Sequence, residues 1–251
     1  MKPIDLEKLY AAFSEQMTKV VQHGNCLMAR GEARDIGPSD SFDTISWDNY
    51  FRDLSFGSFR KYWDGDKYVS RRRAWHYLFK NLKLIERIFE LPTTEVRLLD
   101  VGCASGYLRR FIEGNASPNE AKRIFYWGVD VRESVLKKAV TATTDIESGA
   151  AGNFSPAAFV HHDTRDGLPF CGAFFDVVVC FQMLKYLPIF QAKDLLCEFR
   201  RVVQPGGSAF ISTDTDYRYY RSKKKYEGFA ITLSPQELVQ LLITWTRKTV
   251  H

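Results

Sequence analysis

Residues 96–112 constrain the fold more than any other stretch of this chain. They begin with an apolar run, Val96–Val101, turn abruptly at small residues, and continue at helical spacing as far as Ile112. This order predicts a buried strand, a tight turn and a helix, with Asp100 near the end of the strand. The turn contains Gly102, Ala104, Ser105 and Gly106, small residues that would let a ligand touch the backbone. A carboxylate beside backbone N–H groups suits an amino-acid-like cofactor better than a bare phosphate.

Apolar runs and amphipathic segments alternate along the rest of the chain. This alternation is typical of βαβ units, in which helices cover both faces of a parallel sheet. The strands that we expect are Val96–Val101, Ile124–Val129, Ala157–His161, Phe175–Phe181 and Ser208–Thr213. The helices that we expect are Gly106–Ile112, Ser134–Thr143, Phe190–Val203 and Ser234–Trp245. The sequence therefore predicts an α/β fold, a three-layer sandwich with a mostly parallel, twisted sheet.

The first 95 residues lack this alternation and are expected to form a helical N-terminal extension. Leu6–Val21 and Trp75–Phe89 have apolar residues at helical spacing, whereas Gly24–Asp43 has the composition of a loop. Residues 47–73 interleave aromatic and basic side chains, which fits either a lid over a ligand or amphipathic helices with a solvated charged face. We predict two units: the extension or lid at residues 1–95 and a ligand-binding domain at 96–251.

Composition narrows the class of protein and its setting. The 251 residues are 45% hydrophobic and 26% charged, which is ordinary for a globular protein, and the net charge of +5 permits an anionic partner. The five cysteines include no CxxC pair, which argues against a disulfide framework or a zinc cluster. No apolar run is long enough to span a bilayer. We expect a soluble protein of the cytoplasm or the nucleus, with no membrane association.

Acidic residues follow the second and third expected strands, where ligands of an open parallel sheet bind. Asp130 stands where it could accept both hydroxyls of a ribose, and Asp163 is suited to an exocyclic amino group. His161 and His162 are interpreted as packing groups, and no metal site is predicted, because no further His, Cys or carboxylate has ligand spacing to them. Either acid alone could be a helix cap, but their order behind Asp100 makes the pattern specific.

In this order the motifs resemble those of class I methyltransferases that use S-adenosylmethionine. The matching segments are Leu98–Gly106, Gly128–Val131, Asp163 with Leu168–Phe170, Phe175–Val178 and Gln204–Phe210. The resemblance covers about residues 95 to 245 and implies S-adenosylmethionine as the cofactor. The binding residues that it implies are Asp100, Gly102, Ala104, Ser105 and Gly106 around the methionine moiety, Asp130 and Val131 at the ribose, Asp163 and Thr164 at the adenine, and Phe181, Gln182 and Met183 beside the sulfonium. Ala104 stands where the family usually has glycine.

Two other nucleotide-binding motifs do not fit the turn. The dinucleotide motif G-x-G-x-x-G would need glycine where Ala104 and Tyr107 stand, and a tyrosine there blocks the close approach of helix and strand. The P-loop motif G-x-x-x-x-G-K-[ST] does not occur.

The acceptor side of the site is less specific. Methyl transfer from a sulfonium is an in-line displacement, so holding the acceptor close and in line can supply much of the catalysis. Lys185 and Tyr186 stand where related enzymes often carry an active-site histidine, which makes them the candidate catalytic residues, with no general base assigned. Residues 217–226 combine five basic residues with four tyrosines, which suits a phosphate-bearing or nucleic-acid acceptor or, alternatively, a solvated loop. The candidate substrate-binding residues there are Tyr217, Arg218, Tyr220 and Arg221.

The leading hypothesis is a methyltransferase that acts on a small or phosphate-bearing acceptor, with residues 1–95 and 216–228 as a lid. One alternative is an RNA methyltransferase of the cap guanine-N7 type, to which Phe181–Tyr186 and Gly206–Asp214 are similar. Another is a catalytically silent methyltransferase-like partner subunit or a truncated isoform.

The end of the chain departs from the family pattern. In the family two more strands follow a helix such as Ser234–Trp245, whereas only Thr246–His251 remain here, so the C-terminal strands look incomplete. We expect the sheet edge to be covered by the N-terminal region or by a second chain.

Overall fold

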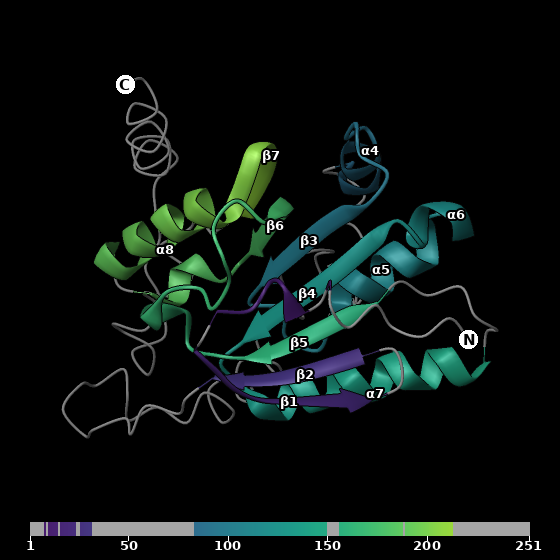
Figure 1. Ribbon diagram of the computed structural model, residues 1–251, viewed down its shortest axis with the longest axis horizontal. Helices are drawn as coiled ribbons and strands as arrows, with labels where there is room; N and C mark the ends of the chain where they lie inside the picture. The colour runs from purple at the N-terminus through teal and green to yellow at the C-terminus, as the bar shows by residue number, and fades with distance from the viewer. Residues whose placement is uncertain are drawn as a thin grey trace, which may run out of the picture.

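The computed structural model describes residues 8, 10–14, 16–23, 26–31, 83–149, 156–187 and 189–212. These residues contain a seven-stranded sheet in the order β1-β2-β5-β4-β3-β6-β7, with helices on both faces (Figure 1). The strands are β1 Met17–His23, β2 Cys26–Gly31, β3 Val96–Val101, β4 Ile124–Asp130, β5 Ala157–His161, β6 Phe175–Phe181 and β7 Val203–Ser212. The helices are α4 Leu84–Phe89, α5 Tyr107–Asn115, α6 Pro118–Ala121, α7 Glu133–Gly149 and α8 Ile189–Val202, with 3-10 turns η1 Thr164–Asp166 and η2 Leu184–Tyr186.

The sheet is parallel except for β1, which pairs antiparallel with β2. In Figure 1 the arrows of β3, β4 and β5 therefore run in one direction and the arrow of β1 runs the other way. The carboxyl ends of the parallel strands consequently meet at one rim of the sheet, where the functional residues of such folds gather.

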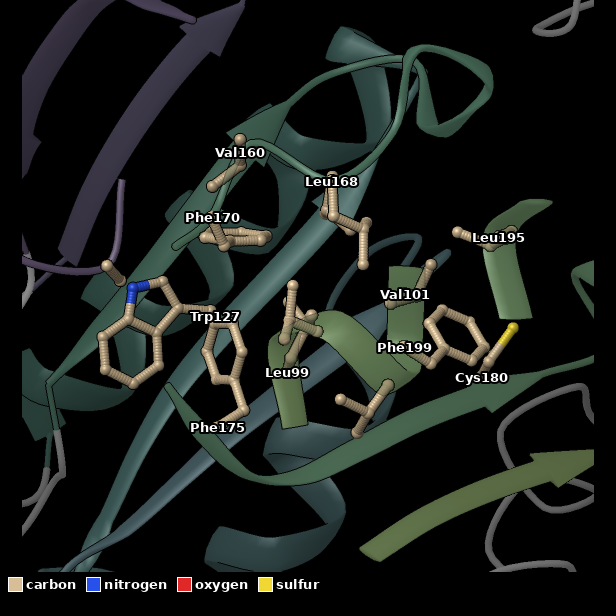
Figure 2. Packing of buried hydrophobic residues seen from close by; sticks show 14 of the residues in the cluster. Leu99, Val101, Trp127, Val160, Leu168, Phe170, Phe175, Cys180, Leu195 and Phe199 are labelled. Atoms are coloured by element: carbon tan, nitrogen blue, oxygen red, sulfur yellow. The ribbon is translucent and has the colours of Figure 1, made fainter. Parts of the chain in front are cut away.

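Two hydrophobic cores form because alternate residues of each strand face opposite sides of the sheet. Leu99 and Val101 of β3 belong to the core beneath α8, whereas Val96 and Leu98 belong to the core beneath α5 and α7. Figure 2 shows the first core, in which the fully buried Trp127 packs edge-on against Phe175, with ring centroids 5.4 Å apart. This continuous burial holds the strand ends in register.

The predicted elements of the α/β part are largely confirmed. Val96–Val101, Ala157–His161 and Phe175–Phe181 have the predicted bounds, and β4 extends one residue further, through Asp130. β7 begins at Val203, earlier than predicted, and α7 extends through Gly149, beyond the predicted end at Thr143. The short α6 was not predicted, although Ser117 and Glu120 form a capping box at its start. The helix expected at Ser234–Trp245 lies outside the described residues.

The prediction for the N-terminal segment is partly wrong. Met17–Val21, expected in a helix, lies in β1, and Cys26–Gly31, expected in a loop, is β2. β2 pairs with β5 from Cys26–Ala157 to Arg30–His161, and it is buried over Cys26–Ala29. The backbone pairing offered by the edge of β5 overrides the local helical spacing. The division of the chain at residue 95 stays a prediction.

The described N-terminal strands lie at the edge of the sheet opposite β7. The expectation that the N-terminal region covers the edge beyond the last parallel strand is therefore wrong for β1 and β2. Coverage by a second chain stays a prediction. None of the helices in the described ranges is long and apolar enough to cross a membrane.

Candidate functional site

The predicted cofactor residues that the structure describes all follow the carboxyl ends of neighbouring parallel strands. Asp100 and the turn of residues 102–106 lie at the end of β3 and just after it, and Asp130 and Val131 lie at the end of β4 and just after it. Asp163 and Thr164 follow β5, and residues 181–183 lie at the end of β6 and just after it. Because the order in the sheet is β5-β4-β3-β6, these groups form a continuous row along the rim. The row is the candidate site.

The turn after β3 has a strained backbone that is tied to β4. Gly102, Ala104 and Gly106 have positive φ angles of 76°, 49° and 72°, which is costly for the one residue with a side chain. The N–H groups of Gly102 and Cys103 both donate to the carbonyl oxygen of Val129, at 2.8 and 3.1 Å. Backbone strain of this kind persists where surrounding structure imposes it, and it often marks functional sites.

Asp130 connects this turn to the second strand end. Its Oδ2 accepts a hydrogen bond from the N–H of Ala104 at 2.9 Å, and its Oδ1 accepts from the backbone N–H of Arg132 at 2.9 Å. The guanidinium of Arg132 adds a contact from Nε to the same Oδ1 at 3.2 Å. Asp130 is 6% exposed, and its Oδ2, which accepts one donor, has lone-pair capacity for a further donor such as a ribose hydroxyl.

Asp163 repeats the arrangement one strand further along the sheet. Its Oδ1 accepts from the backbone N–H of Arg165 at 3.0 Å, which caps η1, and its Oδ2 accepts from the guanidinium at 2.6 Å. Both acids therefore belong to an Asp-x-Arg sequence in which the arginine folds back on the carboxylate. The two arginines were not among the predicted site residues, although the repeated Asp-x-Arg spacing could have drawn attention to them.

Asp100 is the most buried of the three acids, and its partner is a tyrosine. The hydroxyl of Tyr126, on β4, donates to Asp100 Oδ2 at 2.6 Å. Burial raises the pKa of Asp100 to about 7, opposed by the hydrogen bond from Tyr126 and reinforced by the negative charge of Asp130. The charged form of this buried carboxylate would be stabilised by a cation that binds beside it.

The segment after β6 packs directly on the turn. A Cβ atom at Gly102 would lie 2.8 Å from Met183 Cγ and 2.9 Å from Met183 Cβ, so only glycine allows this approach. Gln182 has a positive φ of 59°, and its N–H donates to the carbonyl oxygen of Ser212 at 2.8 Å, which connects β6 to the end of β7. Lys185 and Tyr186 follow in η2 at the same rim, and the structure does not describe the side chain of Lys185.

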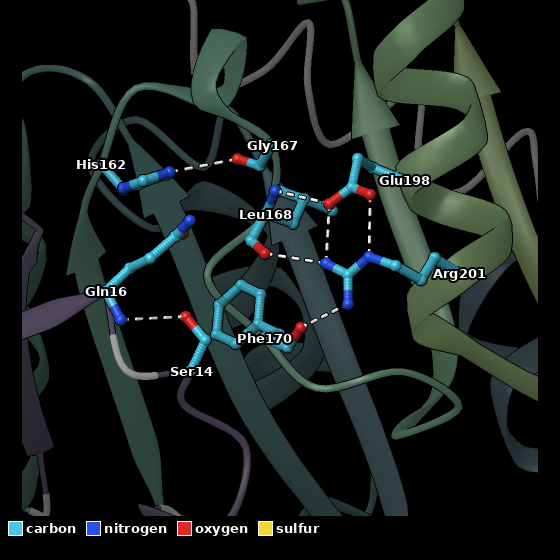
Figure 3. Close-up of polar contacts among 8 residues, drawn as sticks. All are labelled: Ser14, Gln16, His162, Gly167, Leu168, Phe170, Glu198 and Arg201. Atoms are coloured by element: carbon cyan, nitrogen blue, oxygen red, sulfur yellow. Dashed lines mark hydrogen bonds and ion pairs between the residues drawn. The ribbon is translucent and has the colours of Figure 1, made fainter.

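A clamp from α8 holds the loop between β5 and β6 (Figure 3). Glu198 accepts a hydrogen bond from the N–H of Leu168 at 2.8 Å and pairs with Arg201 at 2.6 Å. Arg201 in turn donates to the carbonyl oxygens of Leu168 and Phe170, at 2.8 and 2.7 Å. His162 Nε2 lies 3.1 Å from the carbonyl oxygen of Gly167, and burial lowers the pKa of this histidine. The loop that carries Asp163 is thus fixed at both ends.

β2 brings further residues to the rim that the sequence did not indicate. Arg30 forms an ion pair with Glu133 at the start of α7, where Lys137 also contacts the carboxylate at 3.1 Å. Hydrogen bonding to Lys137 lowers the pKa of Glu133. A Cβ atom at Gly31 would lie 2.7 Å from His162 Nδ1, so the strand approaches β5 closely at this end. These contacts join the N-terminal hairpin to the rim.

The Gln204–Gly207 segment, at the start of β7, lies at the opposite end of the sheet from the site. Gln204 donates to the buried carboxylate of Asp176, which also accepts from the N–H of Arg97 at 2.7 Å. A Cβ atom at Gly207 would lie 2.7 Å from the carbonyl oxygen of Asp176. This motif therefore joins β3, β6 and β7 rather than lining the site.

Other predicted features fall outside the described residues or concern metals. The candidate substrate-binding residues Tyr217, Arg218, Tyr220 and Arg221 are outside. Within the described ranges no group of three or more His, Cys, Asp or Glu side chains could hold a metal ion. His161 Nε2 lies 3.0 Å from the carbonyl oxygen of Val131.

Part of this chain is similar in sequence to known methyltransferases. Residues 98–207 match the family model described as "Methyltransferase domain". A ubiquinone biosynthesis O-methyltransferase of Pseudomonas aeruginosa PAO1 is 28% identical over 117 residues, which are 47% of this chain and 44% of that protein. The chain therefore spans less than half the length of the curated relatives that it matches.

Solved structures share the fold. Magnesium protoporphyrin IX methyltransferase of Synechocystis PCC 6803, with bound SAH, has a TM-score of 0.53 and 16% identity, over 72% of this chain and 78% of that one. The [4+2]-cyclase SpnF has a TM-score of 0.52 and 24% identity, over 74% of this chain and 62% of that one. The match over residues 98–207 and the shared sheet order show that this part of the chain is similar to methyltransferase domains.

Proposed function

We propose that this chain transfers a methyl group from S-adenosylmethionine to a small-molecule acceptor. The observation that carries the proposal is the row of three acids, Asp100, Asp130 and Asp163, along one rim beside a small-residue turn. The fold alone would not support it, because a structure of similar fold is named a cyclase.

The residues at the rim fit the parts of this cofactor. Asp100 is a buried acceptor for the ammonium group of the methionine moiety, and Asp130 Oδ2 has remaining capacity for a ribose hydroxyl. Asp163 would accept the adenine amino group in place of one of its contacts with Arg165. The close packing of Met183 on Gly102 positions the segment after β6 beside the turn, where the sulfonium would lie. When bound, S-adenosylmethionine supplies an electrophilic methyl group and leaves as S-adenosylhomocysteine.

The chain's own contribution to the reaction would be binding and orientation. An acceptor oxygen held in line with the bond between sulfur and methyl carbon needs little further activation once it is deprotonated. Tyr186 stays a candidate catalytic residue because η2 places it at this rim. Lys185 stays a candidate by its position in the chain.

The acceptor that we favour is a phenolic hydroxyl. The basis is the name of the curated relatives, ubiquinone biosynthesis O-methyltransferase, over the part of the chain that they share. A phosphate-bearing acceptor or a messenger-RNA cap depends on residues 217–226, which the structure does not describe, so neither gains support from the geometry.

Calorimetry and a methyl-transfer assay test the proposal in two steps. Titration of the full chain with S-adenosylmethionine should show binding, and a catechol should then accept a methyl group from the labelled cofactor. An absence of cofactor binding would favour the catalytically silent alternative. Transfer to a capped RNA but not to the catechol, with salt-sensitive binding, would favour the RNA alternative.

A further inference from the structure

We propose that Tyr126 is a positioning residue for the cofactor, whose hydroxyl holds the Asp100 carboxylate charged and aimed at the ammonium group of the methionine moiety. This inference rests on the proposed function, because it assigns a role within the same site. Tyr126 lies inside a strand, four residues before the acid that ends it.

The sheet register brings the two side chains together. Tyr126 pairs with Leu98 across β3 and β4, so Asp100 is its diagonal neighbour two residues along. Leu98 and Tyr126 belong to the same core, and Asp100, two residues after Leu98, points to the same face. Diagonal neighbours on one face lie within reach of a long aromatic side chain, as the 2.6 Å contact demonstrates.

The tyrosine ring is held in place independently of the acid. Its exposed fraction is 1%, and its ring packs at a tilt against Phe159, with centroids 5.8 Å apart. The hydroxyl is therefore a preorganised donor, and a phenylalanine would keep the same packing. Loss of the hydroxyl would leave the buried carboxylate without this hydrogen bond, which is the costly outcome for a charged group.

The groups around Asp100 otherwise disfavour its charge. Burial and the carboxylate of Asp130 raise the pKa of Asp100, and the hydrogen bond from Tyr126 acts in the opposite direction. The neighbouring thiols, Cys103 in the turn and Cys180 on β6, have raised pKa values and stay neutral. The positive charge of Arg109 on α5 tends to lower the pKa of Tyr126, and the positive charge of Arg132 tends to lower the pKa of Cys103. Tyr126 is therefore the group that favours the charged carboxylate before a cation arrives.

The test compares Tyr126→Phe with the unsubstituted chain, using S-adenosylhomocysteine titrated from about pH 5.5 to about pH 8.5. In the unsubstituted chain the affinity should rise with pH through about pH 7 as Asp100 ionises. In Tyr126→Phe the midpoint should move at least about one pH unit upward, and the affinity at pH 7 should fall about tenfold. An unchanged profile would overturn the inference.

Two controls separate this role from a general structural effect. Adenosine, which lacks the methionine moiety, should bind Tyr126→Phe and the unsubstituted chain equally; a similar loss for both ligands would mean a structural role and overturn the inference. In an Asp100→Asn background the further change Tyr126→Phe should leave the affinity unaltered. If the unsubstituted chain bound no S-adenosylhomocysteine, the proposed function would fail first. A carboxyl NMR titration of the ligand-free chain would then still test whether Tyr126→Phe raises the pKa of Asp100.

Discussion

The Asp130 carboxylate accepts a hydrogen bond from the backbone N–H of Ala104 at 2.9 Å, across the gap between the end of β4 and the turn after β3. Asp130, the acid expected at the ribose, therefore also stabilises the turn after β3, which is expected at the methionine moiety. A change at Asp130 affects both the ligand and the shape of its site.

The substitution Asp130→Asn separates these two roles better than Asp130→Ala. The amide oxygen of asparagine can still accept from Ala104, but the charge that pairs with Arg132 is lost. We expect S-adenosylmethionine affinity to fall about tenfold or more in both variants, and stability to fall further in Asp130→Ala. Calorimetry and thermal unfolding measure the two effects, and normal binding by Asp130→Asn would contradict the assignment.

Asp100 is expected to reduce the stability of the ligand-free protein at neutral pH. Its pKa is about 7 in the folded state, against an ordinary value of 3.8 for an aspartate in the unfolded chain. The folded state therefore binds more protons between these values, so the contribution of Asp100 to stability falls as pH rises through that window.

Asp100→Asn should consequently stabilise the ligand-free chain above about pH 7, with the gain vanishing near pH 4. Asparagine keeps an oxygen that accepts from Tyr126, so the packing is retained. Thermal unfolding as a function of pH measures the effect, and the same variant should lose affinity for S-adenosylmethionine. A stability difference that does not change with pH would show that Asp100 is already ionised in the folded state.

The sequence predicted the ends of the central strands well, because a strand that is buried on both faces has a continuous run of apolar residues. Val96–Val101 and Phe175–Phe181 read as strands without any knowledge of their neighbours, and Asp100 was located within the first of them. Met17–His23 could not be placed in the same way. Its apolar residues fit a helical period, and only the free edge of β5, supplied through β2, makes it a strand.

The hydrogen-bond and ion-pair partners of the acids depend on strand register and side-chain rotamers, which cannot be read from a single sequence. Tyr126 reads as a core aromatic residue, and its contact with Asp100 exists only because β3 and β4 pair with Leu98 opposite Tyr126. Arg132 was not among the predicted site residues, yet it folds back onto Asp130. The positions of the acids were therefore predictable and their electrostatic states were not.

Two substitutions in the turn after β3, Gly102→Ala and Ala104→Gly, should change the stability of the protein in opposite directions. Gly102→Ala places a methyl group 2.8 Å from Met183 Cγ at a φ of 76°, which should cost more than about 1 kcal/mol of stability and weaken cofactor binding. Ala104→Gly relieves a φ of 49° and should gain less than about 1 kcal/mol, with binding retained. Urea unfolding measures both. Equal stability of the two variants would mean that the turn is not strained at Ala104.

The clamp between α8 and the loop after Asp163 should be sensitive to acid. Hydrogen bonding to Arg201 lowers the pKa of Glu198, so its contribution to stability is present above the pKa of the unfolded chain and is lost as pH falls through the folded value. Glu198→Gln should cost about 1 to 3 kcal/mol at neutral pH, because the N–H of Leu168 and the guanidinium lose a charged acceptor. The difference from the unsubstituted chain should shrink at acid pH. Asp194→Asn, an exposed change on the same helix, is the matched control and should leave the unfolding midpoint unchanged. If both variants unfolded alike, the clamp would not stabilise the loop that carries Asp163.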